Sequence, residues 1–186
     1  MEKRAPSLRL SKMCSASPDT VYETIAEVSS HLDWGGSKQR RDFRLLSLDC
    51  PDGPASAGLT FESTGAIPMS SKRWEDRSTV TEAVRPRVFE FVTQSRAGSG
   101  AKAMTARFIN RYEIAAVDGR SKVTYTQTQE QISNPFLRLA LPGLRQMMWR
   151  FGIPMFARRG FSNLIESAEA AARIRPPKPA AASGHR

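Results

Sequence analysis

The chain holds few of the residue combinations that enzymes use for catalysis. Its two histidines are His31 and His185, and because His185 lies in a tail rich in Pro and Ala, a Ser-His-Asp triad would have to use His31. No Gly-x-Ser-x-Gly elbow accompanies it, so we interpret His31 as the polar end of a helix. The stretch GAIPMSSK at 65–72 ends in lysine but lacks the second glycine of a phosphate-binding loop. The sequence therefore leaves open whether the protein is an enzyme.

Metal and cofactor chemistry is not indicated either. The two cysteines, Cys14 and Cys50, have neither the spacing of a zinc site nor the density of a secreted disulfide scaffold. We therefore expect no metal and no cofactor. The start of the chain lacks the apolar core of a signal peptide, so we expect a cytoplasmic protein.

The composition indicates one globular domain with unevenly distributed charge. The 186 residues are 40% hydrophobic and 25% charged, with a formal net charge of +10. Residues 1–130 carry 19 Lys and Arg against 16 Asp and Glu, whereas residues 131–186 carry 9 against 2. This basic protein has no motif that reads nucleic acid, so we do not expect nucleic acid as a partner. No window reaches the roughly 18 consecutive apolar residues of a transmembrane helix.

Two elements open the chain. Residues 7–14 alternate apolar and polar side chains, which predicts a strand. The motif Ser-Pro-Asp at 17–19 supplies an N-cap hydroxyl, a proline at the first helical position and an acid in the first turn. Apolar residues follow at helical spacing and predict a helix over 18–29, after which Trp34 is expected to anchor the chain on the core.

The middle of the chain has the composition of a β-meander. Turn signals such as PDGP and DG separate runs rich in Val, Ile, Thr, Phe and Tyr. Because short connections join antiparallel neighbours, these runs and the N-terminal strand predict a sheet of about seven strands. The six predicted strands of the meander cover 43–49, 59–63, 73–84, 88–95, 105–117 and 121–131.

The C-terminal region predicts a long helix that covers this sheet. After Pro154, apolar residues recur on one stripe for roughly 20 residues, enough for about 30 Å. Pro142 and Pro154 interrupt the preceding run, so 141–161 indicates a broken helix that leads into the last one. The predicted organisation is an N-terminal tail over 1–6, a single domain over 7–174 and a disordered tail over 175–186.

This order of elements resembles the START-related helix-grip superfamily (SRPBCC), which includes polyketide cyclases/dehydrases, pollen-allergen-like proteins and lipid-transfer domains. The resemblance rests on SASPDTVYETIAEV at 15–28 with Trp34 after it, on STVTEAVRPRVFEF at 78–91 and on SKVTYT at 121–126. These segments specify a fold and not a reaction. The resemblance implies an α+β helix-grip fold, in which a curved antiparallel sheet of about seven strands wraps around a long C-terminal helix and encloses an apolar cavity.

Strand alternation indicates which side chains would face that cavity. Residues two apart share one face of a sheet, so each strand contributes one inward row, and a slip of one residue would turn a whole row outward. Polar members of an inward row need hydrogen-bond partners or water. The candidate ligand-binding residues are Trp74, Asp76, Phe89, Phe91, Phe108, Asn110, Tyr112, Tyr125, Gln127 and Gln129.

The resemblance implies a protein that binds a hydrophobic small molecule or lipid in this cavity. One alternative is an enzyme of the polyketide cyclase/dehydratase or aromatase type that uses the same cavity, with Asp76 and Tyr112 as its acid–base candidates. The other is a membrane-associated carrier or interaction module, and a cavity filled by the protein's own side chains would favour an interaction module.

The arginine-rich segment before the last helix is interpreted as a lid. Leu144, Met148 and Phe151 are the lid candidates, and methionine suits such a position because its unbranched chain fills irregular space. Residues 134–160 hold five arginines and no acid, and each arginine near an anionic membrane contributes about 1 kcal/mol. Peripheral contact with an anionic membrane through 134–160 is therefore expected as a second role, and an ordinary core helix is the alternative.

Overall fold

The computed structural model of the chain describes residues 7–35, 44–66, 73–98, 103–133 and 153–174. The predicted tails at 1–6 and 175–186 lie outside these residues, and so do the three lid candidates. The elements, in chain order, are β1 (Ser7–Cys14), α1 (Pro18–Ala26), the 3-10 turn η1 (Val28–Ser30), α2 (His31–Gly35), β2 (Arg44–Asp49), β3 (Thr60–Ala66), β4 (Arg73–Val84), β5 (Val88–Ala97), β6 (Met104–Val117), β7 (Arg120–Ile132) and α5 (Ile153–Ile174).

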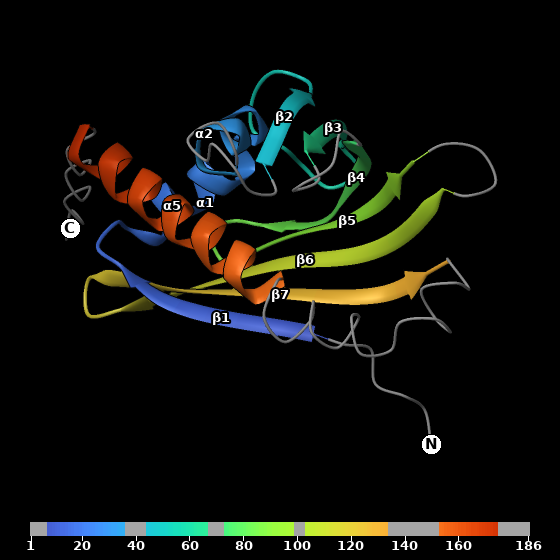
Figure 1. Cartoon of the computed structure of the whole chain (residues 1–186). Helices are drawn as coiled ribbons and strands as arrows, with labels where there is room; N and C mark the ends of the chain where they lie inside the picture. The colour runs from blue at the N-terminus through green and yellow to red at the C-terminus, as the bar shows by residue number, and fades with distance from the viewer. Residues whose placement is uncertain (1–6, 36–43, 67–72, 99–102, 134–152, 175–186) are drawn as a thin grey trace, which may run out of the picture.

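The strands form one seven-stranded sheet in the order β1-β7-β6-β5-β4-β3-β2. Every neighbouring pair is antiparallel, so β2 to β7 make a meander and β1 is added at the edge of β7. Figure 1 shows the sheet curving below α5, with α1 and α2 beside that helix. The predicted α+β helix-grip fold is confirmed, and the predicted strands agree with the observed ones to within about three residues at their ends.

The first helix begins where the sequence predicts and ends three residues before its predicted end. The Ser17 side chain caps α1 by accepting a hydrogen bond from the Thr20 N–H at 3.2 Å. The predicted helix over 18–29 stops at Ala26, because Glu27 leaves helical geometry with ψ at 85°. The chain continues through η1 into α2, which brings Trp34 into the core at 7% exposure. The anchoring role predicted for Trp34 is thus consistent with its burial.

His31, interpreted from the sequence as the polar end of the first helix, is the first residue of α2 and is buried. Its Nε2 lies 2.8 Å from the Ile25 carbonyl oxygen, and because a carbonyl only accepts, the ring carries its proton on Nε2. Burial lowers the pKa of His31 to about 4, against the opposing effects of the bond to Ile25 and the charge of Glu27. His31 is therefore a neutral member of the core.

The final helix packs with one face on the remaining helices and on β1. Its buried residues are Phe161, Leu164, Ile165 and Ala168, which recur at the spacing of one helix face. Polar contacts fix its position: Asn163 Nδ2 donates to the Trp34 carbonyl oxygen at 3.1 Å, and the Ser15 N–H donates to Glu169 Oε1 at 2.9 Å. The sheet and α5 thus enclose the core between them.

One close approach within the sheet requires glycine. Gly65 of β3 pairs with Trp74 of β4, and a Cβ atom built on Gly65 would lie 1.8 Å from the Trp74 ring. The indole therefore lies over the bare backbone of β3. No rotation of a methyl group can relieve such an overlap, so a side chain at Gly65 must displace the indole.

We expect Gly65→Ala to lower the free energy of unfolding by about 1–2 kcal/mol, because the displaced indole loses its packing. In a Trp74→Ala background the same change should be neutral or slightly stabilising, since alanine is favoured over glycine within a strand. Urea unfolding of the four proteins of this double-mutant cycle measures the coupling. Equal effects of Gly65→Ala in both backgrounds would show that the two residues do not compete for the same space.

Candidate functional site

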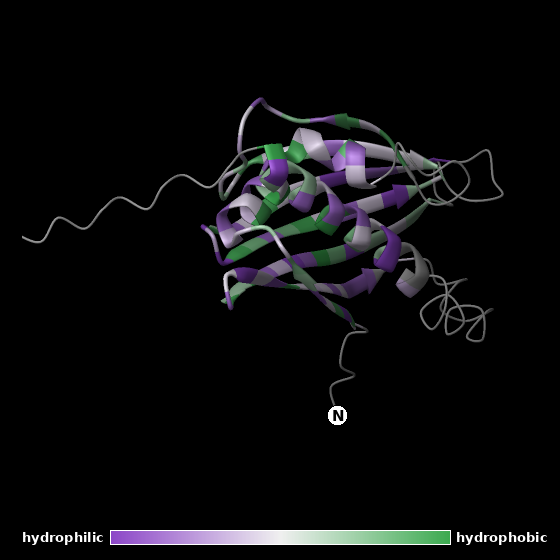
Figure 2. Cartoon of the chain, turned by 90° about the vertical axis from the view of Figure 1, so that its left-hand side faces the viewer, coloured by the Kyte–Doolittle hydropathy of each residue, from purple (hydrophilic) through white to green (hydrophobic). Residues whose placement is uncertain are grey.

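The inward rows predicted from strand alternation are present in the sheet. Along β6 the residues with buried side chains alternate with more exposed ones, and Figure 2 shows that the strands mix hydrophobic and hydrophilic residues. The rows continue across the sheet through the strand register. The ten residues on inward rows that were predicted to contact ligand are Trp74, Asp76, Phe89, Phe91, Phe108, Asn110, Tyr112, Tyr125, Gln127 and Gln129.

Aromatic side chains fill the part of this inner face that lies beneath the helices. The rings of Tyr112 and Tyr125 stack with centroids 4.8 Å apart, and Tyr125 stacks on Phe161 of α5 at 6.1 Å. Phe89 is completely buried and meets Tyr22 of α1 edge to face at 6.1 Å. Burial raises the pKa of both tyrosines on the sheet well above the usual value. We assign Phe89 to the protein core on this evidence.

A chain of hydrogen bonds crosses four strands next to this aromatic cluster. The Tyr125 hydroxyl donates to Asn110 Oδ1 at 2.8 Å, and Gln127 Nε2 donates to the same oxygen at 3.3 Å. Asn110 Nδ2 donates to Thr93 Oγ1 at 3.2 Å, and that oxygen lies 2.9 Å from the Ser78 hydroxyl. Asn110 uses both ends of its amide, so it forms the centre of the polar network.

Asp76 also faces inward and lies two residues before Ser78, nearer to the start of β4. In the register of the sheet it stands between Ser63 of β3 and Ser95 of β5. The side chains of Ser95 and Trp74 hydrogen-bond to the carboxylate, yet its Oδ1 atom is buried and has no hydrogen-bond partner among the described residues. Burial raises the pKa of Asp76 to about 6, while the two hydrogen bonds oppose that increase. The surroundings of Asp76 therefore disfavour the ionised form of its carboxyl group.

The two acid–base candidates, Asp76 and Tyr112, do not meet. Asp76 pairs across the strands with Ser95, and Ser95 pairs with Ala106 of β6. Tyr112 lies six residues further along β6, a distance of roughly 20 Å at the usual rise of a strand. A single reacting atom cannot contact both side chains, so Tyr112 and Asp76 do not form an acid–base pair.

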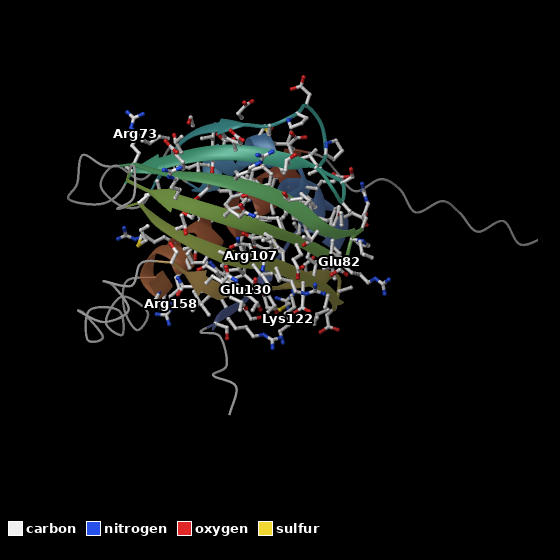
Figure 3. The ribbon with its side chains drawn as sticks, turned by 90° about the vertical axis from the view of Figure 1, so that its right-hand side faces the viewer. Arg73, Glu82, Arg107, Lys122, Glu130 and Arg158 are labelled. Carbon is white, nitrogen blue, oxygen red and sulfur yellow. The ribbon has the colours of Figure 1, made fainter. Side chains whose placement is uncertain are left out.

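The opposite face of the sheet carries a polar groove of about 1100 Å³. Its charged side chains form ion pairs between strands, with Arg77 Nε 3.8 Å from Glu62 Oε1 and Arg107 paired with Glu130. Figure 3 shows Arg107 and Glu130 on the face turned away from α5. Its lining residues are Glu62, Glu75, Asp76, Arg77, Gln94, Ser95, Arg96, Thr105, Ala106, Arg107, Gln129, Glu130, Gln131 and Ser133.

This groove is distinct from the predicted cavity. Most of its lining residues occupy outward positions, but Asp76 and Gln129, which belong to inward rows, line it as well. The groove was not predicted from the sequence. Its lining holds four carboxylates and three arginines, so both signs of charge occur in the groove.

Two members of the inner network were absent from the predicted site. Thr93 joins Asn110 to Ser78, and both hydroxyl residues are buried, at 7% and 2% exposure. Thr93 is two residues after Phe91 on β5, so the same alternation that selects Phe91 also turns Thr93 inward. The signal was therefore present in the sequence.

Two further observations limit the chemistry of the described part of the chain. No group of three or more His, Cys, Asp and Glu side chains in it is arranged to hold a metal ion. None of its helices is long and apolar enough to cross a membrane. The segment predicted to contact an anionic membrane, 134–160, lies mostly outside the described residues, so that contact stays a prediction.

Comparisons with known proteins support the fold. No family model matches the chain, and the search of curated proteins finds no match. The chain is similar in structure to a conserved protein from Geobacillus kaustophilus, with a TM-score of 0.64, 13% identity and coverage of 89% of this chain and 96% of that one. It is also similar to protein CV1439 from Chromobacterium violaceum, with a TM-score of 0.60, 13% identity and coverage of 88% and 98%.

A third similar structure is that of Ara h 8.0201, with a TM-score of 0.57, 10% identity and coverage of 91% of this chain and 98% of that one. At such identities the likeness concerns the fold alone. The curved sheet and C-terminal helix are thus shared with these proteins, and the site must be interpreted from the residues of this chain.

Proposed function

We propose that the protein binds a hydrophobic small molecule or lipid on the inner face of the sheet, in the region that extends from Asn110 towards the start of β4 and the end of β5. The observation that carries the proposal is the polar network on this face. Pockets for organic ligands combine aromatic walls with a few placed polar groups. The hydrogen-bonded group of Ser78, Thr93 and Asn110, which lies beside the rings of Phe91 and Phe108, has this character.

Exposed aromatic surface on the same face supports the proposal. Trp74, Phe91 and Phe108 belong to inward rows, and each remains only partly buried. An apolar ligand that covers such rings gains roughly 25 cal/mol per Å² of surface removed from water. The polar network would then orient the ligand, while the rings would supply most of its binding free energy.

A blocking variant tests this proposal. Ala97 lies inward at the end of β5, between Trp74 and Met104 in the register, so Ala97→Trp places an indole on the candidate site. We expect 1-naphthalenemethanol, an apolar probe with one hydroxyl group, to bind the wild type in isothermal titration calorimetry. Ala97→Trp should weaken this binding at least tenfold.

The matched control is Gln94→Trp, which adds the same indole at an exposed position on the opposite face of β5. Its affinity for the probe should equal that of the wild type. A wild type that does not bind the probe, or equal binding by the wild type and Ala97→Trp, would contradict a binding site on the inner face.

An enzyme of the polyketide cyclase/dehydratase type is the second candidate function. The observation that favours it is Asp76, whose pKa of about 6 lets the carboxyl group act as an acid or a base near neutral pH. Because Tyr112 lies roughly 20 Å away along the sheet, such an enzyme would use Asp76 without it. Asp76→Asn would abolish turnover of a polyketide-like substrate while leaving its binding intact.

A further inference from the structure

We propose that the ligand of the inner face carries a protonated amine, which pairs with the carboxylate of Asp76. This inference rests on the proposed function, because it identifies one chemical group of the molecule that would bind there. Asp76 would then determine specificity, whereas the aromatic rings would bind the rest of the ligand.

The first step of the argument concerns hydrogen bonds. Ser95 and Trp74 donate to the Asp76 carboxylate, and Oδ1 is left without a donor among the described residues although it is buried. An ionised carboxylate accepts up to four hydrogen bonds, and an unsatisfied buried acceptor is costly. A ligand that brings an N–H donor to Oδ1 removes this cost.

The second step concerns charge. No Lys or Arg occurs at the inward positions of β3 to β7 as described, which are occupied by apolar, hydroxyl and amide side chains besides Asp76. The residues opposite Asp76 on both neighbouring strands are serines. Within the described part of the sheet no cation stands at the inward positions around Asp76, so a cationic group on the ligand supplies a counter-charge.

The third step concerns space and neighbours. Beside Asp76 the inward positions are small, with Ser63 and Ser95 on either side and Ala106 beyond. Trp74 lies two residues before Asp76 on the same face of β4, and the face of its indole ring also attracts a cation. Asp76 as a whole is only partly buried, and rotation about its Cβ–Cγ bond is soft, so an amine can reach either oxygen.

Three probes with one ring system and different charges test the inference. They are 1-naphthylmethylamine, 1-naphthalenemethanol and 1-naphthoate, which are positive, neutral and negative near neutral pH. We expect the wild type to bind the amine about tenfold more tightly than the alcohol, since hydrogen bonds between charged groups are worth more than neutral ones. The net charge of +10 favours the anion non-specifically, so a preference for the amine must come from a local site.

Two variants locate the effect. Asp76→Asn should reduce the preference for the amine to within about twofold of the alcohol and leave the affinity for the alcohol unchanged. Glu75→Gln is the matched control, because it removes the same charge from an exposed side chain on the opposite face of β4. It should keep the preference of the wild type.

The outcomes separate this inference from the proposed function. Binding of the alcohol without preference for the amine, or an amine preference that survives in Asp76→Asn, would overturn the role of Asp76 and leave the binding site standing. Binding of none of the three probes would contradict both. Circular dichroism of Asp76→Asn establishes that the variant is folded, as expected for a neutral side chain of the same shape.

Discussion

Asn110→Ala is expected to lower the free energy of unfolding by about 3 kcal/mol. The Asn110 amide accepts from Tyr125 and Gln127 and donates to Thr93. Removing it leaves the buried Tyr125 hydroxyl without its acceptor and the Thr93 oxygen without its donor, and each unsatisfied buried group costs about 1–3 kcal/mol. Urea unfolding at neutral pH, monitored by circular dichroism, measures the loss.

Two single substitutions in the same network are the controls. Tyr125→Phe removes one hydrogen bond but leaves Asn110 bonded to Gln127 and Thr93, so we expect a loss of about 1 kcal/mol. Gln127→Ala should cost less still, because Gln127 is partly exposed and lies at the end of the network. A cost of Asn110→Ala no larger than that of Tyr125→Phe would show that Asn110 is not the centre of the network.

Replacing His31 and replacing Asp76 should change the response of stability to acid in opposite directions. The pKa of His31 is lowered to about 4, so below 6.5 the unfolded chain binds a proton that the folded protein does not, and stability falls as the pH drops from 6.5 to 4. The pKa of Asp76 is raised from 3.8 to about 6, so the folded protein binds the extra proton and stability rises as the pH drops through the same range. Each effect amounts to about 3 kcal/mol in full.

In the wild type the two contributions largely cancel between pH 4 and pH 6. Asp76→Asn leaves the His31 contribution alone, so this variant should lose stability steeply on acidification and should be more stable than the wild type above pH 6. His31→Phe leaves the Asp76 contribution alone and should gain stability on acidification. Its lost bond to the Ile25 carbonyl oxygen lowers the curve at every pH but does not change its slope.

Urea unfolding of the three proteins at intervals between pH 4 and pH 8 measures these slopes. The comparison uses differences between proteins, so other carboxylates that titrate in this range affect all three curves alike. Parallel curves for the wild type and Asp76→Asn would show that Asp76 titrates normally, and the electrostatic argument for an amine on the ligand would lose its basis.

The fold and the inward rows could be predicted from the sequence because both depend on local patterns. Alternation with period two places Phe108, Asn110 and Tyr112 on one face of a strand, and turn dipeptides separate one strand from the next. The capped start of α1 could equally be predicted from the Ser-Pro-Asp motif at 17–19. These signals require no knowledge of which residues meet across the sheet.

The remaining features depend on contacts between strands, which one strand does not specify. Register shifts interrupt the β4–β5 pairing between Val80 and Glu82 and the β6–β7 pairing between Arg107 and Phe108. No sequence pattern predicts these shifts. The link from Asn110 to Thr93 requires the register of β5 against β6. The separation of Asp76 from Tyr112 and the groove on the outer face follow from the same pairing.

Native mass spectrometry of the protein, isolated gently from its own host, tests the proposed function most directly. We predict an adduct of a small organic molecule on the wild type and on Gln94→Trp, and its loss from Ala97→Trp. A molecule that contains a basic nitrogen would also support the role of Asp76. A mass equal to that of the bare chain, together with no binding from a lipid extract of the host, would contradict the proposal and favour an interaction module whose interior is filled by its own side chains.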